Sequence, residues 1–134
     1  MGVDLNLMHI PNGVTLPDVQ AVEQVDGPQK HPEVLYLARL HPRKRPMYFA
    51  RAAKTAGSRW PEARFSLVGP DEGEGPAVSR SIAAMDGEAR VKWSGSEEPD
   101  RTLLRMSRAS IYALPSTDEP FPMSVLEAMS VGLP

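Results

Sequence analysis

The feature that most constrains the fold of this chain is a regular alternation of short apolar runs and helical patterns that begins near residue 33. The first run, residues 34–38, is continuously apolar, as in strands buried on both faces of a parallel sheet. A helical pattern follows, which starts at Pro46 and ends at Gly57. The same unit then recurs, with strands expected at residues 64–68, 90–93 and 111–114 and helices at residues 76–85, 100–107 and 120–132. Four strands that alternate with four helices predict an α/β fold, a doubly wound Rossmann-like parallel sheet with helices on both faces.

The first 32 residues carry a different pattern. Residues 5–10 form one short apolar run, and the turn signal Pro11-Asn12-Gly13 ends it. From there to residue 32 the chain is polar and contains proline and glycine, so we expect a loop with at most one helical turn near residues 19–25. We therefore divide the chain into a strand and linker over residues 1–32 and a sheet domain over residues 33–134.

The composition of the chain argues against several classes of function. A length of 134 residues suits one domain, and a formal net charge of -2 gives no general attraction to nucleic acid. No apolar run approaches the ~20 residues of a membrane span, and the N-terminus lacks the features of a signal peptide, so we expect a cytoplasmic protein. There is no cysteine, and His9, His31 and His41 do not have the spacing of metal ligands, so we expect neither a metal nor another cofactor.

Polar residues follow the predicted strands at one edge of the sheet. Ligands of doubly wound sheets bind at the carboxyl ends of the strands, which here lead into Arg39, Gly69 and residues 115–119. Arg39 and Lys44 lie on either side of the first strand-to-helix turn, so a guanidinium and an ammonium can close on one anion from two sides. A diphosphate fits such a pair. The alternative is a solvated basic turn at residues 43–45.

The last predicted helix adds two carboxylates to this edge. Glu119 lies on the loop that enters the helix, and Glu127 lies inside it. Free amides in the first turn of a helix bind anions, so a phosphate flanked by two carboxylates that grip sugar or ribose hydroxyls fits this arrangement. Apart from Ser124, Glu127 and Ser130 the helix is apolar nearly all round, which predicts burial against the sheet. In the alternative interpretation, the acidic residues only complement the helix dipole or face solvent.

In these residues the chain resembles the donor-binding domain of retaining glycosyltransferases of the GT-B fold, specifically the large family 4 group. The most specific match is the E-x7-E element that runs from Glu119 to Glu127. The resemblance covers most of the chain and rests on four pieces in the family's order: Ile10-Pro11-Asn12-Gly13-Val14, Leu37-Ala38-Arg39-Leu40 with Lys44, Leu67-Val68-Gly69, and the E-x7-E element followed by Ala128-Met129 and Gly132-Leu133-Pro134.

The resemblance implies transfer of a sugar from a nucleotide-diphosphate donor to a hydroxyl acceptor, with retention at the anomeric carbon. Two Rossmann-like domains would do this across a cleft. Residues 33–134 would be the nucleotide-sugar-binding domain without its C-terminal part, half of a GT-B fold, and residues 1–32 a remnant of the strand and linker between domains. The acceptor would be bound by an N-terminal domain that the chain lacks, so the fragment alone is expected to be inactive. Peripheral association of the full-length protein with the inner face of a membrane is left open.

The resemblance also implies roles for individual residues. Arg39 and Lys44 would hold the diphosphate and stabilise the leaving group, and Glu119 would face the transferred sugar, which makes these three the candidate catalytic residues. Glu127 would grip the ribose. The remaining candidate substrate-binding residues are Gly69, Phe121, Met123 and Ser124.

Two other functions fit the same pattern. A nucleotide-sugar 2-epimerase of the same architecture would convert a bound nucleotide-sugar without an acceptor. A non-catalytic Rossmann-like module would instead bind a partner protein through the helix that starts at Pro46, which would then expose a large apolar patch. Analogy of fold alone does not decide between these functions.

Overall fold

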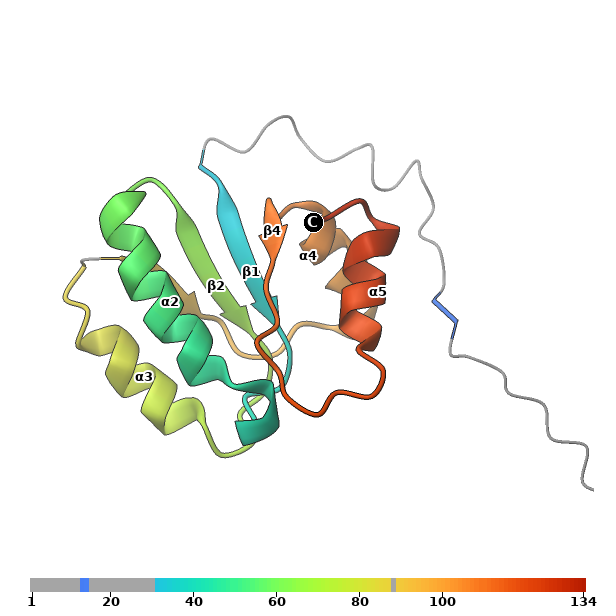
Figure 1. The fold of residues 1–134 in the computed structure, drawn as a ribbon, viewed down its shortest axis with the longest axis horizontal. Coiled ribbons are helices and arrows are strands. Elements are labelled where there is room, and N and C mark those ends of the chain that lie inside the picture. Colours follow the sequence, from blue (N-terminus) through green and yellow to red (C-terminus); the bar gives the residue numbers. More distant parts are fainter. Residues whose placement is uncertain (1–12, 15–30, 88) are drawn as a thin grey trace, which may run out of the picture.

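The structure is a computed structural model that describes residues 13–14, 31–87 and 89–134. Within these residues the chain forms one four-stranded sheet, in which every neighbouring pair of strands is parallel. The chain runs outward from β1 to β3 and then crosses to the other side of β1, where ligands of such sheets bind. The strands lie in the order β3-β2-β1-β4 (Figure 1) and are β1 (Glu33–Leu37), β2 (Arg64–Val68), β3 (Arg90–Trp93) and β4 (Ile111–Tyr112).

Helices cover both faces of the sheet, which confirms the predicted doubly wound α/β fold. Successive residues of a strand point to opposite faces, so Leu35 and Tyr36 of β1 mark the two sides. Tyr36 packs in a core cluster with Phe49 of α2, whereas Leu35 packs with Met106 of α4 and Ala128 of α5. The helices are α2 (Pro46–Arg59), α3 (Gly75–Ala83), α4 (Thr102–Ser107) and α5 (Met123–Ser130), with short 3₁₀ turns η1 (Pro42–Lys44) and η2 (Pro99–Arg101).

The solvent-facing side of α2 is mostly polar. The guanidinium of Arg45, just before the helix, lies 5.1 Å from the centre of the Tyr48 ring, so the large aromatic residue on this side is itself next to a charge. This surface is not the large apolar patch that a partner-binding module would need, and the structure gives that alternative no support. The exposed residues of α2 are Tyr48, Arg51, Ala52, Lys54, Thr55, Ser58 and Arg59.

The predicted burial of the last helix is wrong. We expected its apolar side chains to be buried nearly all round, but Ala128 is the buried residue of α5, and Met129 is 66% exposed. The helix packs beside α4 at the edge of the sheet (Figure 1). The neighbouring strand β4 is two residues long and offers little surface, so only the side of α5 that faces the sheet is covered.

Several element boundaries also differ from expectation. Gly57 does not end α2: this glycine is buried within the helix, which continues to Arg59. The strand expected at residues 111–114 ends after its second residue. Pro122 does not belong to α5: its φ of -80° is helical, but its ψ of 85° is not, so the helix begins at Met123. Proline fixes φ and leaves ψ free, which is why a proline pair alone placed this start too early.

Some predictions fall on other parts of the chain. The strand expected at residues 5–10 and the helical turn expected near residues 19–25 lie outside the described residues, so the division of the chain after residue 32 stays a prediction. In the part of the chain that the structure describes, no helix combines the length and the apolar character needed to cross a membrane.

Candidate functional site

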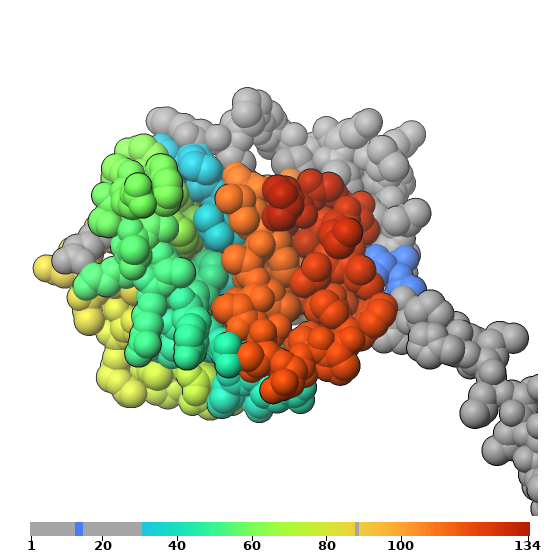
Figure 2. Space-filling model, in the orientation of Figure 1, coloured from blue at the N-terminus to red at the C-terminus, as the bar shows by residue number. Residues whose placement is uncertain are grey.

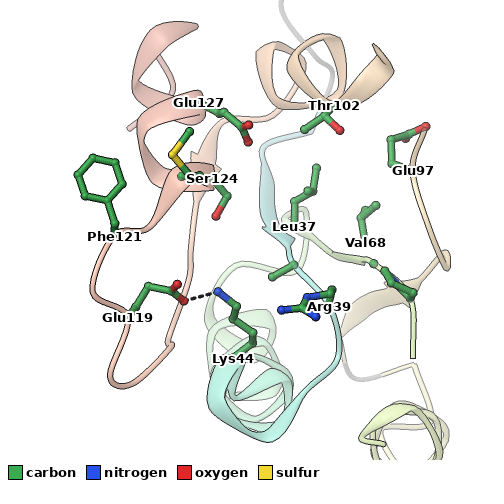
Figure 3. Close-up of a pocket in the computed structure, with 14 residues that line it drawn as sticks. Leu37, Arg39, Lys44, Val68, Glu97, Thr102, Glu119, Phe121, Ser124 and Glu127 are labelled. Atoms are coloured by element: carbon green, nitrogen blue, oxygen red, sulfur yellow. Dashed lines mark hydrogen bonds and ion pairs between the residues drawn. The ribbon is translucent and has the colours of Figure 1, made fainter. Parts of the chain in front are cut away.

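A cavity of about 360 Å³ lies at the carboxyl ends of β1 and β2, facing the start of α5 (Figure 3). The structure therefore brings together, at one mouth, side chains that come from separate loops and from α5. The roles of these residues stay predictions. The eight residues to which the sequence analysis assigned catalytic or binding roles all line this cavity: Arg39, Lys44, Gly69, Glu119, Phe121, Met123, Ser124 and Glu127.

The turn after β1 places Arg39 and Lys44 on one wall of the cavity. Leu40 is fully buried, and its amide donates a hydrogen bond to the Pro70 carbonyl (2.8 Å), which ties this turn to the loop after β2. His41 then caps η1 with its Nδ1 atom. These contacts fix the backbone on either side of the two cations.

Gly69 lies where β2 ends, and no other residue fits there. Its φ is 150°, and a Cβ atom would lie 2.0 Å from the Ala38 carbonyl oxygen. The Gly69 amide donates to the Gly95 carbonyl (2.7 Å), and the Gly69 carbonyl accepts from the Trp93 indole (2.9 Å). The absence of a side chain thus lets the ends of β1, β2 and β3 approach one another closely beside the cavity.

The loop that leads to α5 is held against η1. The Arg43 guanidinium donates to the Asp118 carbonyl (2.5 Å), and the Thr117 amide donates to the Arg43 carbonyl (2.9 Å). The two segments lie side by side on the surface (Figure 2). Asp118 has a φ of 51°, a conformation that a non-glycine residue seldom adopts, and the turn that it makes leads directly into Glu119.

The Lys44 ammonium and the Glu119 carboxylate form an ion pair in the cavity (Figure 3). Their side chains are only 19% and 23% exposed, so water and salt screen this pair less than a surface pair. The family resemblance implies that they contact different parts of a ligand, Lys44 the diphosphate and Glu119 the sugar. A ligand that contacts both residues would have to separate them.

Arg39 pairs with a residue to which the sequence analysis gave no role. Its Nη1 atom lies 2.9 Å from Oε1 of Glu72, in the glycine-rich loop after β2. Spacing along the chain could not have revealed this pair, because the two loops meet only in the folded protein, where a bridge joins Leu40 to Asp71. Both cations that were predicted to close on an anion therefore lie beside carboxylates.

The first turn of α5 faces the same cavity. Within the described residues no side chain caps this helix, but the amides of Met123, Val125 and Leu126 already donate to the carbonyls of Phe121 and Pro122, which leaves the Ser124 amide for a bound anion. Ser124 and Glu127 lie about one turn apart and point toward the cavity, whereas the ring of Phe121 points away from it (Figure 3). Any contact from Phe121 to a ligand would come from its backbone.

Tyr112 supports this wall from behind and was missed by the sequence analysis. Its hydroxyl donates to the Leu37 carbonyl (3.0 Å) at the end of β1, and the Ser124 side chain lies close enough to lower the pKa of the phenol. Burial raises the pKa of Tyr112 to about 12, and the nearby carboxylates of Glu127 and Glu119 act in the same direction. The phenol therefore stays protonated at neutral pH. Its signal in the sequence was a large aromatic with a polar tip in a short strand.

Glu97 and Thr102 line the same cavity and were also missed. Glu97 lies in the loop after β3, and Thr102 begins α4 (Figure 3). A second cavity of about 450 Å³ shares both residues and extends to Gly13 and Val14. The rule that ligands bind at the carboxyl ends of strands covers the loop after β3, but no motif in the sequence singles out Glu97.

Metal ligands do not cluster in the described ranges, where no three His, Asp or Glu side chains meet in a way that could hold a metal ion. That the site works without a metal or another cofactor stays a prediction.

Two curated proteins are similar to this chain. The UDP-Gal:alpha-D-GlcNAc-diphosphoundecaprenol alpha-1,3-galactosyltransferase of Escherichia coli is 31% identical over 135 residues, which cover 93% of this chain and 34% of that protein. The D-inositol 3-phosphate glycosyltransferase of Rhodococcus jostii (strain RHA1) is 33% identical over 108 residues, which cover 75% of this chain and 24% of that protein. The chain thus spans about a third or less of the length of these relatives.

Solved structures agree with this likeness. The crystal structure of the pneumococcal O-GlcNAc transferase GtfA in complex with UDP and GlcNAc superposes with a TM-score of 0.70 at 25% identity, over 79% of this chain and 21% of that one. This confirms the predicted Rossmann-like half of a GT-B fold. The family of glycosyl transferases group 1 matches residues 20–134, which is most of the sequence. The chain belongs to the glycosyl transferases group 1 family.

Proposed function

We propose that this protein supplies the donor-binding half of a retaining glycosyltransferase, which transfers a sugar from a UDP-sugar to a hydroxyl acceptor. The observation that carries the proposal is the single cavity in which Arg39, Lys44, Glu119 and Glu127 meet, in a chain of the glycosyl transferases group 1 family. The donor assignment is supported by the E. coli relative, whose name states UDP-Gal, and by the pneumococcal enzyme, whose structure contains UDP.

In this proposal different charged residues of the cavity contact different parts of the donor. The diphosphate lies between Arg39, Lys44 and the first turn of α5, where fixed positive charge stabilises the departing UDP. Glu127, inside the helix, accepts hydrogen bonds from the ribose hydroxyls, and Glu119 accepts them from the sugar. The protein orients the donor and neutralises the negative charge of its diphosphate, and it forms no covalent bond to the sugar.

The same relative supports a proposal for the acceptor and for the cellular site. The E. coli enzyme acts on a sugar linked to diphosphoundecaprenol, a lipid carrier. We propose a hydroxyl acceptor bound by another domain of the enzyme, in a cytoplasmic protein that approaches the inner face of a membrane peripherally. The likeness to the two transferases gives no support to the 2-epimerase alternative.

Isothermal titration with UDP-, GDP- and ADP-sugars tests the proposal. The protein should bind a UDP-sugar, and Arg39→Ala and Glu127→Ala should each weaken binding about ten- to a hundredfold, because each removes a charged hydrogen-bond partner worth roughly 1.5–3 kcal/mol. Arg51→Ala, which removes an exposed arginine of α2 outside the cavity, is the control and should bind as the wild type does. A folded protein that binds none of the three sugar nucleotides would refute the donor-binding role.

A further inference from the structure

We infer that Glu72 sets an upper limit on the affinity of the cavity for the donor diphosphate, because it competes with the phosphate for Arg39. The inference rests on the proposed function and deepens it. It names a residue of the glycine-rich loop as a determinant of how tightly the nucleotide is held and how readily UDP leaves.

The contact itself is direct. The Nη1 atom of Arg39 lies 2.9 Å from Oε1 of Glu72, within hydrogen-bond distance. Together with Lys44 and Glu119 the two residues line a smaller cavity of about 210 Å³ that adjoins the main one. The pair therefore lies at the mouth through which a diphosphate would reach both cations.

The backbone holds Glu72 in this position. The amides of Glu72 (3.2 Å) and Glu74 (3.1 Å) both donate to the carbonyl of Leu40, the residue that follows Arg39. Oδ1 of Asp71 accepts hydrogen bonds from the amides of Gly73 and Gly75, each at 2.8 Å, which closes the loop on itself. The Glu72 carboxylate thus stays near Arg39 even when its own hydrogen bond is broken.

A carboxylate and a phosphate offer a guanidinium the same kind of oxygen acceptors, and arginine does not escape the competition by losing its proton. A diphosphate that binds Arg39 must therefore displace Glu72, and it then lies beside an unpaired negative charge. The Arg39 side chain is 61% accessible and that of Glu72 34%, so solvent screens the pair and its cost to binding is modest.

The second ion pair of the site differs in this respect. When a diphosphate takes Lys44 from Glu119, the freed carboxylate faces the sugar of the donor and has hydroxyls to bind. Glu72 has no assigned place on the donor, so its release brings no compensating contact. The Glu72 carboxylate therefore weakens the binding of UDP and the binding of a UDP-sugar to the same extent.

The test compares UDP binding by the wild type, Glu72→Gln and the matched control Glu74→Gln, by isothermal titration in low-salt buffer. Glu74→Gln removes the same charge from the same loop, two residues further on. Glu72→Gln should bind UDP about two- to fivefold more tightly than either of the others, and the gain should shrink at high salt. Uridine, which carries no phosphate, should bind all three proteins equally.

Each other outcome overturns the inference. If Glu72→Gln binds UDP as the wild type does, or if Glu74→Gln gains as much, Glu72 does not compete for Arg39, while UDP binding by the wild type leaves the proposed function standing. Weaker binding by Glu72→Gln would mean that Glu72 orients Arg39 for the phosphate. If no folded variant binds UDP, the proposed function itself fails.

Discussion

The Lys44 ammonium is ion-paired with the Glu119 carboxylate, although 75 positions separate the two residues in the sequence. The pair joins the turn after β1 to the loop before α5, on either side of the point where the winding of the sheet reverses. It neutralises the two charges that a sugar nucleotide would use separately. Binding of a donor would therefore exchange one charge pair for two new contacts.

This exchange leads to a prediction for Glu119→Gln. UDP should bind the variant at least as tightly as the wild type, because Lys44 no longer has a carboxylate partner. The extra affinity of a UDP-sugar over UDP should fall about three- to tenfold, since a charged hydrogen-bond acceptor for the sugar is lost. Isothermal titration with UDP and UDP-galactose measures both quantities. Parallel losses for the two ligands would contradict the assignment of Glu119 to the sugar.

Gly69→Ala should destabilise the fold by about 2 kcal/mol or more, because the new methyl group meets the Ala38 carbonyl and the backbone has a positive φ. Gly95→Ala is the matched control: Gly95 also has a positive φ (76°), but nothing lies within 4 Å of its added Cβ, so strain alone of about 1 kcal/mol is expected. Urea unfolding of both variants gives the comparison. Equal losses would show that the approach of β1 to Gly69 is not tight.

Glu33 gives a prediction about pH. Burial raises the pKa of its carboxyl, but hydrogen bonds from Arg105 and Ser66 outweigh burial and lower the pKa below the ordinary value of 4.5. A carboxylate with a lowered folded-state pKa adds stability above its unfolded pKa, and this stability is lost as the pH falls through the folded-state value. The free energy of unfolding of the wild type should therefore decrease progressively as the pH falls below about 4.5.

Arg105→Met should reverse this dependence. It leaves the buried Glu33 carboxylate without its bidentate partner and should cost about 3 kcal/mol near pH 7. Burial would then dominate and raise the pKa, so the deficit relative to the wild type should shrink as the pH falls toward 4. Urea unfolding at several pH values tests this, with Arg101→Met in the exposed turn η2 as control. A deficit that does not vary with pH would contradict the pairing.

Tyr112→Phe should cost about 1–2 kcal/mol of folding free energy, because it leaves the Leu37 carbonyl without its hydroxyl donor. It should also weaken UDP-sugar binding a few-fold, because Ser124, which lines the cavity, loses the hydroxyl with which it interacts. Tyr48→Phe, on the exposed side of α2, is the control for both measurements. Loss of stability without loss of affinity would confine Tyr112 to a role in folding.

Much of this site could be predicted because its residues follow the predicted strands or belong to a recognisable sequence motif. The ends of predicted parallel strands share one edge, which placed Arg39 and Gly69 together, and the E-x7-E element placed Glu119 on the loop before the last helix and Glu127 inside that helix. The first inference needs only the order of the elements, and the second rests on the spacing of the two glutamates and on the family resemblance. The exact ends of those elements do not matter for them.

Two features of the site region could not be predicted. One depends on the conformation of a loop, and the other depends on the size of the strand next to the last helix. The pairing of Arg39 with Glu72 requires the turn that Asp71 closes, which no spacing rule gives. The exposure of Met129 depends on how short β4 is. The apolar composition of the last helix indicated that it prefers burial. It did not indicate how much surface the neighbouring strand and helix offer to cover it.

The most direct test of the central claim is a titration of UDP-galactose into ¹⁵N-labelled protein, followed by the backbone amide resonances. If the cavity binds the donor, the amides of Gly69, Ser124 and Glu127 should shift, and those of the opposite strand ends, such as Arg64 and Arg90, should not. Saturating shifts confined to the strand ends at Arg64 and Arg90, or no shifts at millimolar ligand, would contradict the claim.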